Sequence, residues 1–296
     1  GTDRPNPITM TAQGNEEETF VNITPKFSLK YDISNNASVY ATAVTGNKSG
    51  GYNYSMFSNV FQEKLSNLRG MPKPLDTLKI AEDAMYYKPE SLWNFEVGSH
   101  FTAFKNKLQI DVAAYYIRYS NMQIVSTLAT NNGSRMIVNA GRSNNLGTEF
   151  SVRLAVVKNL QINVQHGYTK ATFDNFVFDG NDYSGNYVPF VPRNTLSAGA
   201  EYTIDIHKKL LENISIAAQY SYYTNIYFTE RNNIQETFYD VVNASLTFNT
   251  KRLNYGLWAK NAFNRNYTVF YCESLGNSFM QQGKPLQYGF SLAAQF

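Results

Sequence analysis

The stretch that decides the fold reads Asn194-Thr195-Leu196-Ser197-Ala198-Gly199-Ala200-Glu201-Tyr202-Thr203-Ile204. From Leu196 onward, apolar side chains occupy the even positions, while small polar, glycine and carboxylate residues occupy the odd ones. Successive side chains of a β-strand point to opposite faces of a sheet, so this period of two predicts a strand between two unlike environments.

The same alternation recurs along most of the chain. It is clear in residues 160–170, 240–249 and 286–296, where apolar and polar positions again take turns. A helix would instead show a period near 3.6, which these segments lack. We therefore predict about eleven strands, at residues 22–33, 37–46, 92–104, 108–124, 136–156, 160–172, 191–205, 214–229, 238–249, 253–263 and 285–296.

The connections between these strands alternate in length. Short ones are rich in Asn and Lys, as in Lys105-Asn106-Lys107 and Val157-Lys158-Asn159, which is the chemistry of tight hairpins. Long polar loops lie near 47–91, 125–135, 173–190, 230–237 and 264–284. Short turns at one rim and long loops at the other are typical of an outer-membrane β-barrel.

Composition agrees with a barrel and excludes several other classes. Charged residues make up only 17% of the 296 residues and aromatic residues 15%, yet no apolar run reaches the roughly 18 residues of a membrane helix. The net charge of +3 is too small to indicate a nucleic-acid partner. Cys272 is the only cysteine, so the chain has no disulfide framework of its own.

One face of the predicted wall must meet water. A charged side chain at mid-membrane on the lipid face costs a few kcal/mol, so charges at alternate strand positions must point into the lumen. Their apolar neighbours, such as Phe95 and Phe150, then face lipid. The predicted lumen-facing charges are Lys26, Glu96, Glu149, Arg153 and Glu201. We expect most of them to form a charge network on the inner face of the wall and to contact a plug rather than a substrate.

Several ordered motifs resemble the TonB-dependent receptor family. Tyr87-Lys88-Pro89-Glu90 followed by Trp93-Asn94-Phe95-Glu96-Val97-Gly98 is similar to a recurring stretch of its barrel. Further similarities follow in family order, at residues 23–32 with 38–53, 114–123, 139–141 with 147–150, and 261–267. Phe296, after Tyr288, Phe290 and Leu292, resembles the aromatic C-terminal signal read by the membrane-assembly machinery.

This resemblance implies an all-β transmembrane antiparallel barrel of 22 strands. The eleven predicted strands would be its C-terminal half, at residues 22–296, preceded by an extracellular loop remnant at 1–21. The start Gly1-Thr2-Asp3 does not look like an exported terminus, so we expect a fragment or a processed chain. The plug that binds TonB is absent from this chain, and plug and remaining strands would come from elsewhere, because open sheet edges are not tolerated in lipid.

The predicted ligand contacts lie at the long-loop rim. Aromatic side chains with a few cations suit an anionic iron chelate, through stacking and cation–π contact. An alternative is that these aromatics form the interfacial girdle or pack within the loops. The candidates are Tyr52, Tyr54, Arg135, Tyr183, Tyr187, Tyr227, Arg231, Tyr239 and Tyr271, with Phe57, Arg142 and Phe279 beside them.

Other features point to no chemistry of their own. His100, His166 and His207 are far apart in sequence, and we expect neither a metal site, a cofactor nor a catalytic group. Residues 64–83 could form a short helix or lid within their loop. Cys272 would be a lone thiol in the last long loop.

The function expected from this resemblance is energised import across the outer membrane of a Gram-negative bacterium. A ferric siderophore or related iron chelate is the leading nutrient. Heme, cobalamin or an oligosaccharide are alternatives, and a passive porin is the alternative class. The expected partners are TonB through the plug, the rest of the barrel, outer-membrane lipid and the nutrient.

Overall fold

The computed structural model describes residues 19–54, 85–127, 135–178, 180–208, 210–274 and 277–294. No helix among these residues is long and apolar enough to cross a membrane. Residues 1–18 of the expected remnant at 1–21, the lid segment at 64–83 and the terminal Phe296 lie outside the described residues. The expectations for these three remain predictions.

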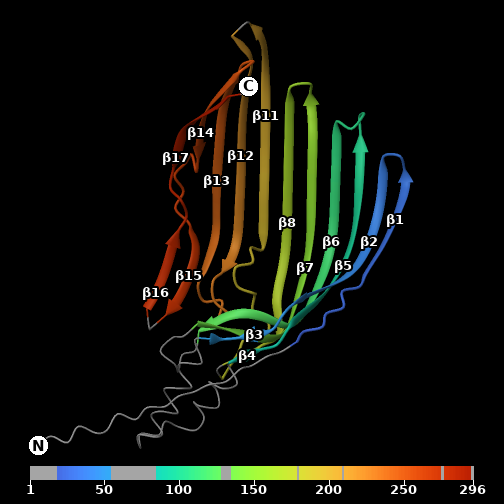
Figure 1. Ribbon diagram of the computed structural model, residues 1–296, viewed down its shortest axis with the longest axis vertical. Helices are drawn as coiled ribbons and strands as arrows, with labels where there is room; N and C mark the ends of the chain where they lie inside the picture. Colours follow the sequence, from blue (N-terminus) through green and yellow to red (C-terminus); the bar gives the residue numbers. More distant parts are fainter. Residues whose placement is uncertain are drawn as a thin grey trace, which may run out of the picture.

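Eleven strands form one curved antiparallel sheet (Figure 1). Each strand pairs with the next in chain order, apart from the short hairpins within the loops. In sheet order the strands are β1 (Lys26–Ser34), β2 (Ala37–Lys48), β5 (Glu90–Ala103), β6 (Leu108–Thr127), β7 (Arg135–Val157), β8 (Leu160–Asn175), β11 (Asn194–Lys208), β12 (Leu211–Tyr227), β13 (Gln235–Asn249), β14 (Leu253–Lys260) and β17 (Gln287–Ala294). The all-β, eleven-stranded prediction is confirmed.

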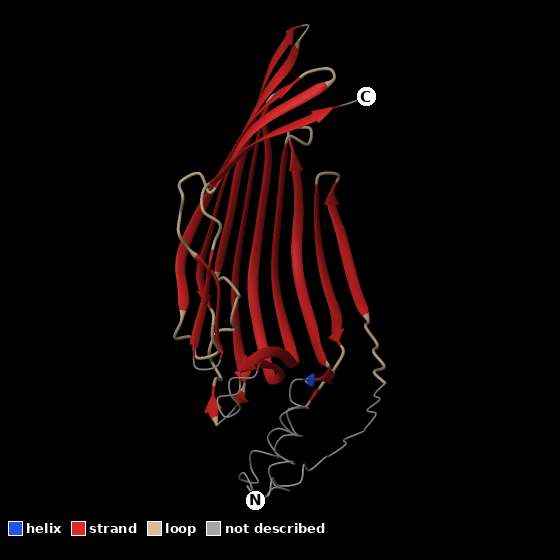
Figure 2. Ribbon diagram, turned by 60° about the vertical axis from the view of Figure 1, so that its left-hand side comes forward, coloured by secondary structure: helices blue, strands red, loops and turns tan. Residues whose placement is uncertain are grey.

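Short turns lie at one end of the sheet and long loops at the other, as the sequence predicts (Figures 1 and 2). The described parts of the long loops also contain three small two-stranded sheets that the sequence analysis missed. They are β3 (Gly51–Tyr52) with β4 (Tyr86–Tyr87), β9 (Val177–Phe178) with β10 (Asn181–Asp182), and β15 (Thr268–Ser274) with β16 (Asn277–Gln282).

The two faces of the sheet differ as the alternation requires. Strand register puts Glu96 in line with Thr42 and Tyr115 on one face, and Phe95 in line with Ala43 and Tyr116 on the other. In the middle of β5, Asn94 and Glu96 are half-buried, while Trp93, Phe95 and Val97 on the other face are exposed. Side chains crowd on the concave face of a curved sheet, so the polar face is concave. We call the face of Glu96 the inner face and the face of Phe95 the outer face.

Glycines on the inner face make room for aromatic rings. Gly98 is opposite Tyr40, and a Cβ atom on Gly98 would lie 2.5 Å from the Tyr40 ring. Gly147 stands opposite Tyr115 in the same way. A ring that covers a glycine on the next strand fills the gap left by the missing side chain and pins the register.

An apolar cluster caps the inner face near the long loops. Ala171 and Phe173 of β8 point inward, and Phe176, Tyr183 and Val188 from the following loop pack against them. The backbone N–H of Val188 donates to the Ala171 carbonyl oxygen, which fixes the loop on the sheet. This buried cluster joins the inner face of β7 and β8 to the loop that follows β8.

The first and last strands of the sheet, β1 and β17, each pair on one side only. Their free edges expose backbone N–H and C=O groups that have no partner among the described strands. Such edges do not occur in contact with lipid, where each unpaired group would cost several kcal/mol. Both edges of the sheet are therefore open to pairing with a further strand.

Candidate functional site

Three tyrosines stack on the inner face close to the long-loop rim. Tyr223 of β12 lies directly opposite Tyr239 of β13, with ring centroids 5.0 Å apart. Tyr239 stacks in turn on Tyr267, with centroids 4.3 Å apart and planes only 9° from parallel. Gly283 leaves room for this ring, since a Cβ there would lie 2.2 Å from Tyr267. Together the rings form a half-buried aromatic surface, which we call the tyrosine stack.

Tyr183 and Arg231, both predicted ligand residues, come together at the same end of the sheet. Tyr183 is only 9% exposed and packs in the apolar cluster of β8. The Arg231 guanidinium donates a hydrogen bond to the Tyr183 hydroxyl, and this bond raises the pKa of Arg231 above its ordinary value. Tyr183 therefore has a packing role, and Arg231 is the more available of the two.

Tyr187 and Tyr227 instead lie on the outer side. Their rings stack with centroids 5.4 Å apart, and Tyr187 forms a β-bridge with Thr172, an outward residue of β8. Asn225, with φ 51°, reverses the alternation of β12 just before Tyr227. The Arg193 guanidinium lies 4.8 Å from the centre of the Tyr187 ring. Sequence analysis missed Arg193, and the outward position of this group separates it from the tyrosine stack.

Asn53 fastens the base of the first long loop. Its side-chain Nδ2 donates to the Ile137 carbonyl at 2.8 Å, and its Oδ1 accepts from the Ile137 N–H at 2.8 Å. Asn139 does the same for Lys88, accepting from its N–H and donating to its carbonyl. Gln123 adds bonds to the Ser49 and Lys88 carbonyls. These residues belong to the motifs found by resemblance, and we call them the loop clasp.

The remaining rim candidates have varied positions. Tyr52 packs at a tilt against Tyr86, with centroids 5.7 Å apart, whereas Tyr54 is largely exposed. Tyr271 is 7% exposed and its hydroxyl is hydrogen-bonded to Glu273 and Ser278, which indicates a structural role. Arg142 forms an ion pair with Asp174 at 3.0 Å, and Phe279 is exposed on β16. Cys272 is a free thiol. Only the backbone of Arg135 at the start of β7 is described, and Phe57 lies outside the described residues.

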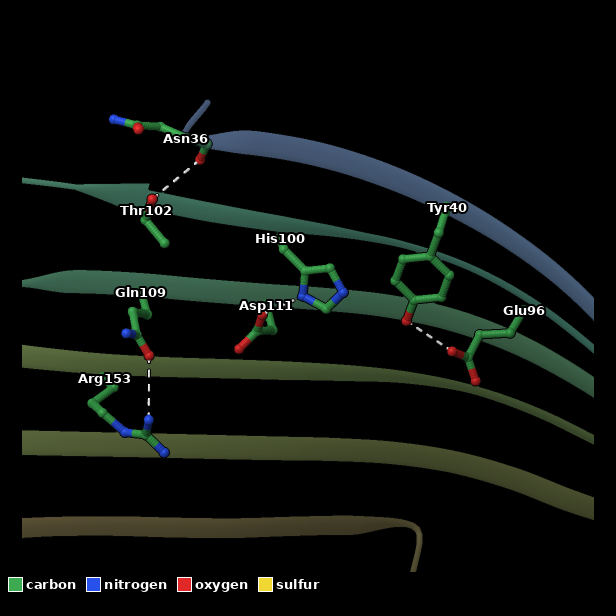
Figure 3. A network of polar contacts seen from close by, with 8 residues as sticks. All are labelled: Asn36, Tyr40, Glu96, His100, Thr102, Gln109, Asp111 and Arg153. Atoms are coloured by element: carbon green, nitrogen blue, oxygen red, sulfur yellow. Dashed lines mark hydrogen bonds and ion pairs between the residues drawn. The ribbon is translucent and has the colours of Figure 1, made fainter. Parts of the chain in front are cut away.

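The inner face carries a polar network nearer the short turns (Figure 3). The Tyr40 hydroxyl donates to Glu96 at 2.8 Å, and the Tyr40 ring stacks on His100. His100 Nδ1 lies 2.6 Å from an Asp111 carboxylate oxygen. The carboxylates of Glu96 and Asp111, together with Glu149, give this part of the wall an acidic surface.

The other predicted lumen charges share this face. Register puts Lys26 in line with Val44 and Asn94, Arg153 in line with Gln109, and Glu201 in line with Gln161. Arg153 donates to Gln109 at 3.2 Å. Among the described residues, Lys26, Glu149 and Glu201 form no ion pair. Their charges are free to meet another surface inside the wall.

The histidines do not assemble into a site. His100 is on the inner face, His166 lies on the outer face between Phe150 and Leu196, and His207 ends β11 at a short turn. No group of three potential metal ligands occurs in the described ranges.

Comparison with known proteins gives consistent matches. The family model described as "TonB dependent receptor-like, beta-barrel" matches residues 2–262. The pesticin receptor of Yersinia enterocolitica is 25% identical over 190 residues, which is 64% of this chain but 26% of that receptor. The chain therefore spans about a quarter of the curated relatives that it matches.

Solved structures share the fold. The ferric yersiniabactin uptake receptor FyuA from Yersinia pestis superposes with a TM-score of 0.69 at 19% identity, covering 92% of this chain and 37% of that one. The siderophore receptor PiuA from Acinetobacter baumannii superposes at 0.62 and 14% identity, covering 90% and 34%. At such identities the likeness concerns the architecture of the wall.

Proposed function

The chain belongs to the TonB-dependent receptor-like β-barrel family, and on that premise we propose that it forms part of the wall of an outer-membrane importer. Members of this family are transport receptors, so the chain is not an enzyme. The inner face would line a wet lumen, and the outer face would meet the lipid of a Gram-negative outer membrane. The matched relatives are longer receptors, and the chain covers 26% of the pesticin receptor and 37% of the FyuA structure, which supports a role as one part of such a wall.

We propose a ferric siderophore or related iron chelate as the cargo. The tyrosine stack carries this proposal, because its rings pack face to face and leave the far side of an end ring, Tyr223 or Tyr267, for stacking with an aromatic, anionic chelate. Arg231, at the same end, supplies a cation that attracts the negative charge of the chelate. The names of two structural neighbours, a ferric yersiniabactin receptor and a siderophore receptor, support the same cargo class.

The inner acidic network would face the plug. Glu96, Asp111 and Glu149 present carboxylates without an arginine or lysine partner among the described residues. A basic surface on a plug would complement them, while TonB would act on that plug from the periplasm. The network then holds the plug at rest, and its polar contacts allow the plug to shift.

Growth on defined iron sources tests this proposal. A strain that depends on the whole receptor is grown under iron limitation with catecholate, phenolate, hydroxamate and heme iron, with and without TonB. We expect TonB-dependent growth on at least one aromatic ferric chelate. Growth on none of them, combined with uptake of an oligosaccharide or of cobalamin, would contradict the cargo. Uptake that does not require TonB would contradict energised import and favour a passive porin.

A further inference from the structure

The outer face turns from apolar to polar along one line near the long-loop rim. The outward residues of β6 run Val112, Ala114, Tyr116 and then Arg118. Those of β8 pass from Tyr168 to Lys170 and Thr172, and Lys170 is directly opposite Leu146. Apolar bands of outer-membrane barrels end at a girdle of aromatic rings, beyond which lipid headgroups begin. Arg118 and Lys170 therefore lie at headgroup level.

These cations are available to a ligand. Arg118 and Lys170 are exposed, and neither forms an ion pair with another residue that the structure describes. Arg193 lies on the same side, but its Nε is buried and its guanidinium contacts the Tyr168 hydroxyl and the Tyr187 ring, so it is less accessible than the other two. Two strand spacings, roughly 10 Å, separate β6 from β8. This spacing suits a headgroup with more than one phosphate.

A groove continues from Arg118 towards the middle of the apolar band. It has a volume of about 640 Å³ and is lined mainly by apolar residues of β1, β2, β5 and β6. Small side chains, Ala41, Ala43 and Ala114, form its floor, while Phe27, Phe95 and Tyr116 border it. Tyr116 is the next outward residue before Arg118, and its hydroxyl donates to Asn144 at 2.8 Å. Groove and cations are therefore continuous.

We propose that this part of the outer face binds one phosphorylated acyl lipid of the outer leaflet. Its phosphates would contact Arg118 and Lys170, and one acyl chain would occupy the alanine-floored groove. Charge complementarity favours an anionic lipid over a second protein, since cations facing lipid are neutralised by anionic headgroups at small cost. The proposal rests on the outer-membrane location proposed above and is independent of which nutrient is imported.

Lipid binding to the whole receptor tests the proposal. The purified receptor in neutral detergent is titrated with diphosphoryl lipid A, monophosphoryl lipid A and phosphatidylethanolamine, and bound lipid is counted by native mass spectrometry. We expect one site that prefers the diphosphoryl lipid. The double variant Arg118→Gln/Lys170→Gln should weaken it roughly 30-fold, because each cation near a membrane surface contributes about 1 kcal/mol.

Two further variants make the result specific. Lys105→Gln/Lys107→Gln removes the same charge at the opposite rim and should leave lipid binding unchanged. Ala43→Phe fills the groove and should weaken binding of all three acylated lipids. Inorganic phosphate, added as a competitor for the cations, should compete no better with this variant than with the unchanged receptor. Each variant is first checked for the compact, detergent-resistant mobility of a folded barrel.

Three results would overturn the proposal. The first is that phosphatidylethanolamine binds as tightly as diphosphoryl lipid A. The second is that the two double variants lose lipid binding to the same extent. The third is that a photo-cross-linker at position 118 reacts with a protein instead of a lipid. None of these results depends on nutrient uptake. The iron-import proposal could therefore be refuted while lipid binding holds, and lipid binding could be refuted while iron import holds.

Discussion

Single residues at the rim show how far position along the chain determines which way a side chain faces. The inward direction of Tyr239 follows from simple alternation along β13. The outward direction of Tyr227 does not, because the left-handed Asn225 interrupts β12. Asparagine favours that conformation, but the sequence does not say which of its many asparagines adopts it. Arg193 was missed for a related reason: it precedes the regular part of β11, where no period can be counted.

The tyrosine stack gives the first residue-level prediction. Tyr239→Ala should weaken binding of the ferric chelate that supports growth by up to about tenfold, since an aromatic pair contributes roughly 0.5–1.5 kcal/mol. Tyr239→Phe keeps the ring and should bind normally. Tyr187→Ala removes a similar ring on the outer side and is the matched control. Equilibrium binding to the purified receptor measures all three, and a loss in Tyr187→Ala alone would refute the inner site.

A second residue-level prediction concerns Gly98. In Gly98→Ala the new methyl group collides with the Tyr40 ring, which loses its bond to Glu96 and its stacking on His100. The free energy of unfolding should fall by about 1–3 kcal/mol. Adding Tyr40→Ala removes the collision, so the double variant should be more stable than the sum of the single changes allows. Urea unfolding of the receptor measures this coupling, and strict additivity would show that the ring and the glycine are independent.

At the scale of elements, long strands could be predicted closely and short ones could not. Residues 92–104 and 136–156 were predicted, against Glu90–Ala103 and Arg135–Val157 in the structure. The first strand was predicted from residue 22, but pairing begins at Lys26. The two-residue strands β3, β4, β9 and β10 contain too few positions to show a period. The bonds of the loop clasp lie beside β3 and β4 and hold that pair in place.

The loop clasp predicts a local effect of Asn53. Asn53→Ala leaves the Ile137 N–H without its acceptor, which costs about 1–3 kcal/mol locally. Hydrogen exchange of the Ile137 amide should accelerate accordingly, while the membrane strands keep their protection. Asn53→Asp keeps an acceptor for that amide but loses the donor to the Ile137 carbonyl, so it should fall between the two. Unchanged exchange in Asn53→Ala would mean that the loop base is held by other contacts.

At the scale of the whole molecule, the fold depends on the separation of oil and water across the sheet. Residues 196–202 form one continuous stretch of strand β11. Its outward residues are Leu196, Ala198, Ala200 and Tyr202, and its inward residues are Ser197, Gly199 and Glu201. Spin labels at successive positions in the bilayer-embedded receptor should alternate between access to oxygen in lipid and access to a water-soluble nickel complex. Neighbouring labels in one environment would exclude a membrane wall.

The directions of the edge strands β1 and β17 restrict how the sheet can be closed into a barrel. All neighbours in the sheet are antiparallel, so the first and the eleventh strand both run towards the short-turn rim. A second copy of this chain with the same orientation in the membrane would place its β1 parallel to β17. Two copies therefore cannot close a barrel in which every pair of neighbouring strands is antiparallel. Such a barrel requires a different segment with an odd number of strands, whose two edge strands run opposite to β1 and β17.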